Sequence, residues 1–282
     1  MFGKRLLVAF DAASVSVAIL GRGPRRRRLL GFRRVALQPG ALAPSPAGPN
    51  LLRREEVREA LSRALEESPP ASGPATLVLP DGVARLAMIE PPSGAEPRDY
   101  VRFKLATSLP WPATEAIVDL LPVRRGRVVG AAVRRATVAQ YEQLAASAGL
   151  AVERVTLAPL LALGALLGRK GRRGPNAVHA LLGDVAFCLA LVRDGDLAAL
   201  RCRRRDRSEG EGLRLLAEAA RTARQAPDEN GDEDGAVPLV VSGSGASPLR
   251  ESLGQAVVGG GLEGPGEWPE SVEAAWLGGA LA

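Results

Sequence analysis

The chain of 282 residues is long enough for one large hydrophobic core or two moderate ones. Its apolar fraction of 46% is ordinary for a globular protein and excludes disorder as the overall state, although aromatic residues make up only 4%. The formal net charge of +6 comes without an aromatic-interleaved basic patch, so the sequence argues against a nucleic-acid-binding protein.

Two cysteines and a single histidine limit the chemistry that the chain can perform. His179 alone cannot build a metal site from the usual nitrogen and sulfur ligands, so no metal site is predicted. Cys188 and Cys202 fall in neighbouring predicted strands, and we expect both to be reduced thiols in the core of a cytoplasmic protein. The longest apolar stretch, 157–167, reaches about half of a membrane span, so we expect the protein to meet a membrane only through a partner.

The first 82 residues are predicted to form one half of a larger α/β fold. Strands are predicted at 6–10, 15–20, 29–37 and 76–79. A tight turn at 11–14 joins the first two strands, and Asn50 is predicted to cap a helix that presents Val57 and Leu61 on one face. Asp11 stands at the tip of the first strand, either as a solvated turn residue or as the remnant of a phosphate-handling hairpin.

Residues 83–157 are predicted to form an inserted α+β module. Its strands are expected at 86–89, 117–123, 128–134 and 151–157. Pro97 begins the first helix and Leu109–Pro112 ends it, because proline fits the first turn of a helix and breaks its interior. Thr137 and Gln140 have the spacing of a capping box, which predicts the start of the second helix.

Residues 158–175 are predicted to be a buried, apolar connecting helix with a basic linker, and residues 176–282 to form a second half. Strands of an antiparallel meander are expected at 177–182, 185–192 and 197–203, with Arg193–Asp196 as a hairpin turn. After the meander come a helix at 209–225, an acidic loop at 228–235, a strand at 237–241 and a last helix at 270–281. The meander repeats the strand–turn–strand opening of the chain, so the sequence predicts two similar halves.

A series of short segments carries a resemblance to a known family. They are Ala9–Ser14, Leu77–Asp81, Tyr100–Phe103, Leu109–Pro112, Thr156–Pro159, Arg193–Gly195, Ser242–Ala246 and Ala275–Gly278. In this order they resemble the PilM family of actin-like proteins in type IV pilus assembly, with the cytoplasmic domain of GspL from type II secretion as a related alternative. The resemblance implies an α/β, actin-like (ribonuclease-H-like) fold of two halves, with an inserted small α+β module and a reduced second half.

The resemblance also implies a nucleotide site, and this chain departs from its pattern. Asp11, Ser14, Gly183, Gly243 and Gly245 match the expected cofactor-binding positions. Alanines follow Asp11 where nucleotide-binding members have glycine, and a side chain there obstructs the approach of phosphate to the backbone.

A second acid is expected just before Gly183, but leucines stand there and Asp184 follows the glycine. The segment 208–236 is also too short for one wall of an adenine pocket. We therefore expect no catalytic residue, no metal and no cofactor. The alternative is an active ATPase that binds ATP and Mg²⁺ through Asp11 and the Gly243/Gly245 turn.

The resemblance implies a scaffold protein that binds the cytoplasmic tail of a PilN-like inner-membrane protein. The protein would then be cytoplasmic and peripheral to the inner membrane through that partner. The secretion ATPase complex is a further implied partner, and self-association is left open. Tyr100, Phe103 and Trp111 are the large side chains available as partner-binding anchors in the inserted module, with core packing as the alternative role for each.

Overall fold

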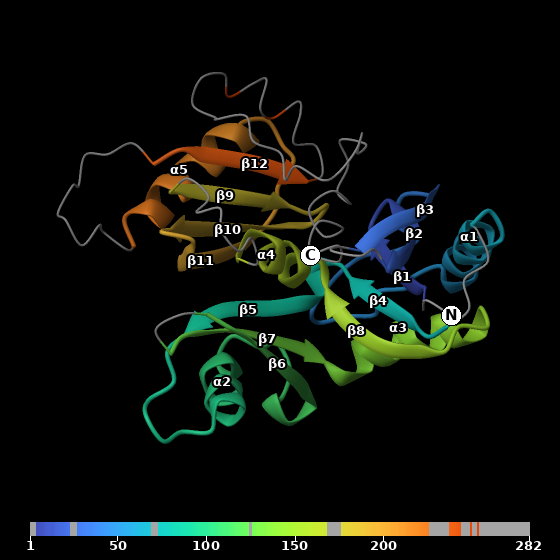
Figure 1. The fold of residues 1–282 in the computed structure, drawn as a ribbon, viewed down its shortest axis with the longest axis horizontal. Helices are drawn as coiled ribbons and strands as arrows, with labels where there is room; N and C mark the ends of the chain where they lie inside the picture. Colours follow the sequence, from blue (N-terminus) through green and yellow to red (C-terminus); the bar gives the residue numbers. More distant parts are fainter. Residues whose placement is uncertain are drawn as a thin grey trace.

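The structure is a computed structural model that describes residues 4–22, 27–68, 73–123, 126–167, 176–225 and 237–243, together with Leu249 and Leu253. The predicted acidic loop at 228–235, the predicted last helix at 270–281 and Gly245 lie outside these residues. In the described part of the chain the strands form sheets of five, four and three strands (Figure 1).

The first sheet contains five strands in the order β3-β2-β1-β4-β8. They are β1 (Arg5–Asp11), β2 (Ser14–Arg22), β3 (Arg27–Ala36), β4 (Ala75–Leu79) and β8 (Val152–Leu157). The predicted tight turn is confirmed, because β1 and β2 pair in antiparallel register up to Asp11 opposite Ser14. β4 lies parallel to β1 on its other side.

Helices cover both faces of this sheet. Successive side chains of β1 point to opposite faces, and the residues on both faces are buried. Val8 and Phe10 belong to the core under α1 (Arg54–Glu66) and α3 (Arg135–Ser147). Leu7 and Ala9 belong to a smaller cluster with residues of α4 (Ala158–Leu167). The first sheet is therefore a central layer.

The predicted helix cap at Asn50 is wrong. Helix α1 begins at Arg54, and Asn50 is fully buried in the loop before it. The side chain of Asn50 donates to the carbonyl oxygens of Ser45 and Gly48 (2.9 and 3.0 Å), and its Oδ1 accepts from the Tyr141 hydroxyl at 3.3 Å. Asn50 thus closes a loop and ties it to α3, a long-range role that local sequence cannot reveal.

The predicted capping box at Thr137 and Gln140 is also wrong. Helix α3 begins at Arg135, so both residues lie inside the helix, and Thr137 is buried. The Gln140 side chain instead accepts a hydrogen bond from the backbone N–H of Asn50 at 2.9 Å. The residue types fit a cap, but the Gln140 side-chain oxygen is instead bonded to Asn50, 90 positions away in the sequence.

The inserted module is a three-stranded antiparallel sheet with one helix packed on it. Its elements are β5 (Ala84–Ile89), α2 (Pro97–Ala106), β6 (Ala116–Pro122) and β7 (Val128–Arg134), with the short helices η1 (Asp81–Val83) and η2 (Ala113–Glu115) beside them. Val101 and Leu105 of α2 pack with Trp111 and Ala132 in the module core.

Two elements that the sequence groups with the module pack elsewhere. β8 pairs in parallel with β4, in the first sheet. Val138, Tyr141 and Leu144 of α3 pack in the core of that sheet. Parallel pairing joins strands that are distant in sequence, so the local order of elements did not predict it.

The second sheet has the order β11-β10-β9-β12. Its strands are β9 (Ala177–Leu182), β10 (Ala186–Arg193), β11 (Asp196–Arg204) and β12 (Leu239–Gly243), and α5 (Glu211–Ala223) follows β11. The meander and its turn are confirmed: Asp194 and Gly195 both have positive φ, 52° and 76°, as a type I′ hairpin turn requires.

Helix α4 lies between the two larger sheets (Figure 1). One set of its residues packs with Leu7 and Ala9 of the first sheet, and Ala162 and Leu163 pack with residues of β9, β10 and β11. Helix α4 was predicted to be buried because it is apolar on all sides, and its packing against both sheets accounts for that character. Among the described residues, none of the helices is both long and apolar enough to cross a membrane.

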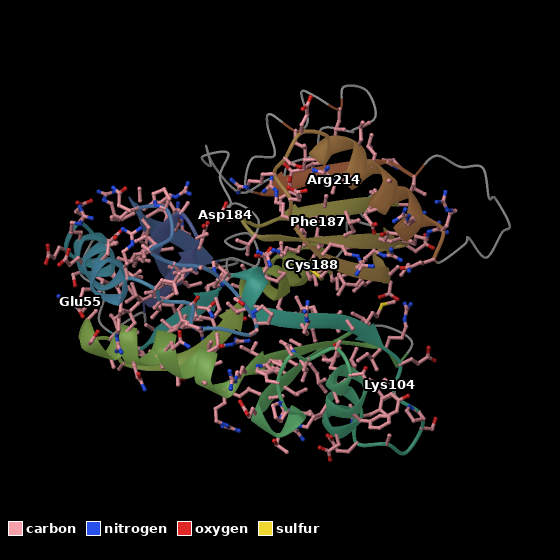
Figure 2. All side chains as sticks on the ribbon, turned by 180° about the vertical axis from the view of Figure 1, so that it is seen from behind. Glu55, Lys104, Asp184, Phe187, Cys188 and Arg214 are labelled. Carbon is pink, nitrogen blue, oxygen red and sulfur yellow. A yellow bond between two sulfur atoms is a disulfide. The ribbon has the colours of Figure 1, made fainter. Side chains whose placement is uncertain are left out.

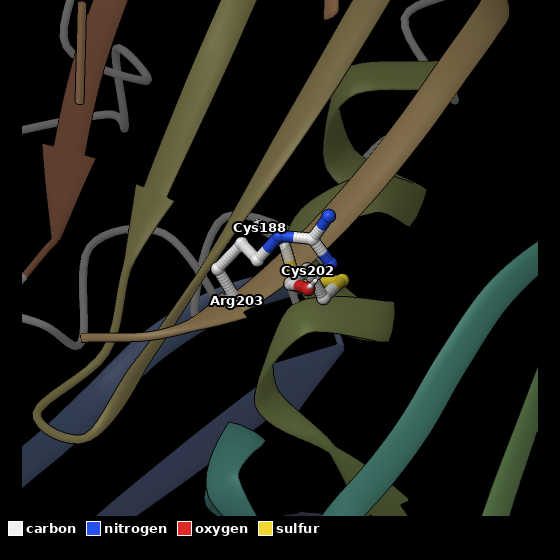
Figure 3. The surroundings of a disulfide bond; sticks show 3 residues. All are labelled: Cys188, Cys202 and Arg203. Carbon is white, nitrogen blue, oxygen red and sulfur yellow. Dashed lines mark hydrogen bonds between the residues drawn. A yellow bond between two sulfur atoms is a disulfide. The ribbon is translucent and has the colours of Figure 1, made fainter. Parts of the chain in front are cut away.

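The expectation that both cysteines are reduced is wrong. Cys188 and Cys202 form a disulfide between β10 and β11 (Figure 3). The two residues are directly opposite in the antiparallel register, with their Cα atoms 4.2 Å apart. The sequence placed them in adjacent strands correctly, but the turn register alone would pair Cys188 with Arg201, and a bulge at Leu191/Val192 moves the pairing by one residue to Cys202.

Candidate functional site

The turns of the two hairpins face each other across a cavity between the halves. The β1–β2 turn, the β9–β10 turn and η1 contribute to its walls, and Ala158 and Ala162 of α4 contribute from the helix between the sheets. Figure 2 shows Asp184 between the two large sheets. The cavity has a volume of about 50 Å³, room for a few water molecules, whereas small-molecule sites usually enclose about 300–1,000 Å³.

Three carboxyl groups meet in this cavity: Asp11 from the end of β1, Asp81 from η1 and Asp184 from the β9–β10 turn. The pKa of Asp11 is raised to about 8, mainly by burial and also by the hydrogen bond and the negative charge of Asp184, while the Ala13 amide and Arg34 act in the opposite direction. At neutral pH Asp11 therefore carries a proton that it shares with Asp184.

Burial also raises the pKa of Asp81, to about 7, and the charge of Asp184 adds to the shift. The backbone N–H of Gly82 and the Arg205 guanidinium act in the opposite direction. Both Asp11 and Asp81 thus titrate near neutral pH, mainly because burial disfavours their charged forms and also because each lies near the charge of Asp184.

Two arginines that follow β11 hold the β9–β10 turn in place. Arg207 forms an ion pair with Oδ1 of Asp184. Arg205, whose side chain is 3% exposed, donates to the Gly183 carbonyl at 2.7 Å and forms an ion pair with Glu211 of α5. The turn that carries Asp184 is therefore fixed from behind by side chains of the second half.

The expectation that no second carboxylate reaches the site is wrong. Asp184 faces Asp11 from the far side of Gly183, and Asp81, predicted to be a simple turn residue, joins them. The sequence comparison looked for the second acid at a fixed place before Gly183, and that position was the wrong guide. Strand ends would have been a better one, since Asp11 and Asp184 both stand at the turn of the first hairpin of their half.

The structure gives a reason for Gly183. The carboxylate of Asp81 lies directly against the Gly183 Cα, so any Cβ there would overlap the carboxylate oxygens. This glycine allows the close approach of η1 to the second half, a packing role that no local turn signal shows.

Ser14 and Gly243 are placed beside the cavity rather than in it. Ser14 is buried, and its hydroxyl accepts a hydrogen bond from Arg34 at 2.9 Å. Gly243 ends β12 with φ +104°, where a Cβ would overlap the backbone of Leu182. Neither residue lines the cavity in the described part of the chain, and Gly245 lies outside that part.

In the first turn the amide of Ala13 is not available to a ligand. The backbone N–H of Ala13 donates to Oδ1 of Asp11 at 2.9 Å, which uses a donor that a phosphate-binding turn would point outward. Among the described residues no group of three histidine, cysteine or acidic side chains is arranged to hold a metal ion. The described lining of the cavity therefore does not fit a nucleotide with Mg²⁺, since the Ala13 amide is already bonded and Asp11 holds a proton.

The three predicted anchor residues of the module have different positions. Trp111 is 7% exposed and packs in the module core, so it is not available on the surface. Phe103 is 71% exposed on α2, and its ring lies 6.5 Å from that of Tyr100. The Nζ of Lys104 lies 5.4 Å from the centre of the Tyr100 ring, and Figure 2 shows Lys104 on the outside of the module. We call Tyr100, Phe103 and Lys104 the α2 patch.

One arginine connects the module to the second half through several polar contacts, beside the apolar packing of Val129 with residues of β9, β10 and β11. Arg127, next to the start of β7, donates to the carbonyl oxygens of Leu197 and Ala198 at 2.8 and 3.2 Å. It also lies 3.3 Å from the carboxylate of Asp196. Both partners of this ion pair are largely buried, at 19% and 15% exposed, so removal of one partner would leave the other charge buried and unpaired.

Two sheets that each begin with an antiparallel hairpin, a shared helix between them and a cavity at the facing turns define an actin-like fold. Comparison with known proteins agrees. No family model matches the sequence, and no curated protein matches it either.

Solved structures do match. The PilM–PilN type IV pilus biogenesis complex is 18% identical, covers 99% of this chain and 98% of its own, and has a TM-score of 0.68. The cytoplasmic domain of EpsL, an inner-membrane component of the Vibrio cholerae type II secretion system, is 14% identical over 85% and 82% of the two chains, with a TM-score of 0.51. A Bacteroides thetaiotaomicron protein of actin-like ATPase fold is 14% identical over 91% and 89%, with a TM-score of 0.55. The predicted actin-like fold is confirmed.

Proposed function

We propose that this protein is an actin-like scaffold of a type IV pilus or type II secretion platform at the inner membrane. It would bind the cytoplasmic tail of a PilN-like membrane protein and stay on the cytoplasmic side through that partner. The observation that carries the proposal is the likeness to the PilM–PilN complex, which extends over 99% of this chain and 98% of that one. The proposal is an analogy from fold and coverage, and the experiments below test it at the site.

The cavity supports a scaffold that does not hydrolyse ATP. Phosphoryl transfer needs a metal ion and positive groups arranged around the reacting phosphate. Here Asp11 and Asp184 share a proton, and the Ala13 amide is bonded within its own turn. A cavity of about 50 Å³ is also much smaller than the sites that usually hold small molecules, which measure about 300–1,000 Å³.

The α2 patch is the surface that we assign to the membrane-protein tail. Among the described residues Phe103 is the most exposed aromatic side chain, at 71%. It lies beside Tyr100 and Lys104. Exposed aromatic rings next to a cation are typical anchors for a short peptide segment.

A peptide-binding assay tests this function. Fluorescence anisotropy would measure binding of labelled N-terminal tails of bitopic membrane proteins encoded beside this one. We expect one tail to bind, and Phe103→Ala to weaken binding about tenfold, a usual effect for a central anchor. Leu213→Ala is the matched control, because Leu213 is 73% exposed on α5, far along the chain from the patch. Failure of every tail to bind would contradict the scaffold; equal binding by Phe103→Ala would contradict the assigned surface.

One observation favours the alternative of an ATP-binding protein. Asp184 supplies the second carboxylate opposite Asp11 that the sequence lacked at the expected position. Calorimetric titration with Mg-ATP separates the two functions. We expect no binding tighter than about 1 mM. Micromolar binding that Asp11→Ala abolishes would establish the alternative instead.

A further inference from the structure

The disulfide between Cys188 and Cys202 holds an outer strand of the second sheet. Strand β11 comes first in the order β11-β10-β9-β12, so among the described residues it pairs only with β10. The register shift between Leu191 and Val192 interrupts that pairing. Outer strands with an interrupted ladder belong to the parts of a sheet that open most easily. The covalent bond to β10 (Figure 3) is thus a second hold on a strand that the ladder holds on one side only.

Strand β11 connects the inserted module with the candidate site. At its start it receives the three hydrogen bonds of Arg127 from the module. Just beyond its end, the backbone N–H of Arg205 donates to the Val185 carbonyl at 2.8 Å, and the Arg205 side chain donates to the Gly183 carbonyl at 2.7 Å. Cys202 lies between these two ends. Its disulfide therefore fixes the strand that joins the module to the β9–β10 turn.

The two sulfur atoms differ in their access to solvent. Cys188 and Cys202 belong to the apolar cluster that also contains Leu163 of α4 and Val129 of β7. Cys188 is 1% exposed, whereas Cys202 is only partly buried. Thiol–disulfide exchange requires a thiolate to reach one of the sulfur atoms. Cys202 is the sulfur that a reductant can approach while the chain is folded.

The setting favours a bond that is made and broken. Reductants keep most cysteines of the cytoplasm as thiols, and the disulfides that do form there are mostly catalytic or redox-sensing. The cytoplasmic setting in this argument rests on the proposed function. The two cysteines are 14 positions apart on paired strands, unlike the Cys-x-x-Cys motif of catalytic dithiols. A redox-sensing bond is therefore the better match.

We propose that the Cys188–Cys202 disulfide is a reversible redox switch that sets how firmly β11 is held between the module and the β9–β10 turn. The oxidised form ties β11 to β10. The reduced form leaves β11 to its one-sided ladder, so the strand opens more often.

The switch needs a dithiol reductant, of the kind that thioredoxin-like proteins carry. One thiolate of the reductant attacks the Cys202 sulfur, and the sulfur–sulfur bond breaks with its electron pair on Cys188, which takes up a proton. The second thiolate of the reductant then displaces the Cys202 thiolate, which is protonated in turn, and the reductant leaves as a disulfide. Two electrons and two protons pass to the protein, and an oxidised disulfide compound reverses the reaction.

Hydrogen exchange of the full chain, followed by mass spectrometry without denaturant, tests the proposal. After reduction with dithiothreitol the amides of β11 should exchange at least about tenfold faster, because the strand has lost its second hold. The amides of β9, which lies between two strands, are the internal reference and should keep their rates. Oxidised glutathione should restore the slow exchange of β11. The Cys188→Ala and Cys202→Ala double variant is the control and should exchange like the reduced protein in both buffers.

Three results would overturn the proposal. They are two free thiols in the air-oxidised protein by thiol titration, reduction that proceeds only after urea has unfolded the chain, and equal exchange of β11 in both redox states. The experiment contains no membrane-protein tail. Failure of the switch is therefore distinct from failure of the proposed function, which the peptide-binding assay measures.

Discussion

Replacing Asp11 by asparagine should stabilise the protein at alkaline pH and leave it unchanged in acid. Asparagine keeps an oxygen for the Ala13 N–H and an N–H donor for Asp184, but it cannot ionise. In the wild-type protein Asp11 must lose its proton as the pH rises, in a cavity that already holds Asp184. The substitution removes that cost and nothing else of similar size.

The direction and magnitude follow from the pKa of Asp11, which is raised from 3.8 to about 8. Between these values the folded chain binds more protons than the unfolded chain, so the free energy of unfolding falls as the pH rises from about 4 to 8. The full shift corresponds to at most about 6 kcal/mol, at about 1.4 kcal/mol for each pKa unit. Water reaching the half-buried carboxyl screens part of this, so we expect about 2–3 kcal/mol in favour of Asp11→Asn at pH 8.5.

Urea denaturation at pH 5.0, 7.0 and 8.5 measures the effect. The unfolding free energies of the two proteins should differ least at pH 5.0 and separate progressively at the higher values, with the variant more stable. Asp119→Asn, which removes an exposed carboxylate far from the cavity, is the matched control. The reasoning is refuted if wild type is equally stable at all three pH values, or if Asp11→Asn is the less stable protein at pH 8.5.

Three further substitutions test the contacts around the cavity and the sheets. Gly183→Ala should destabilise by about 2 kcal/mol, because its Cβ overlaps the Asp81 carboxylate; Gly164→Ala, which has open space, should be neutral or stabilising in thermal melts. Arg127→Met should cost about 2 kcal/mol in urea denaturation by removing three contacts with β11, and an unchanged midpoint would show that the connection carries no stability. Dithiothreitol should reduce the stability of the wild type by about 3 kcal/mol and so lower its melting temperature. The melting temperature of the Cys188→Ala and Cys202→Ala double variant should not change.

Turn chemistry and residue periodicity predicted much of the fold. The Asp-Gly turn between β10 and β11 has a backbone conformation that few residue pairs adopt, so its sequence was specific. The apolar character of α4 on every side predicted a helix enclosed by other elements, and it is enclosed by two sheets. In both cases a local pattern determines the local structure.

Contacts between distant segments could not be predicted in the same way. Asn50 and Gln140 both have residue types that favour helix caps, yet they bind each other across 90 positions. β8 pairs in parallel with β4, although the inserted module separates the two strands in the sequence. No local pattern shows such a pairing. Tertiary contacts decided these positions, and propensity did not.

The candidate site was only partly predictable for the same reason. Asp11 was identified from its place at a strand end, and the structure puts it in the cavity. Asp81 and Asp184 were not, because each looks like an ordinary turn residue until the two halves are brought together. Trp111 was considered as a surface anchor, but the packing of α2 on its sheet buries it.

The central claim is a scaffold that binds a membrane-protein tail without using nucleotide. Its most direct test is the anisotropy titration of the purified chain with the labelled tail, in parallel samples with and without Mg-ATP. We predict binding of the same affinity in both samples, because the cavity at Asp11 and Asp184 does not fit a nucleotide. Tail binding that occurs only after Mg-ATP is added would contradict the account.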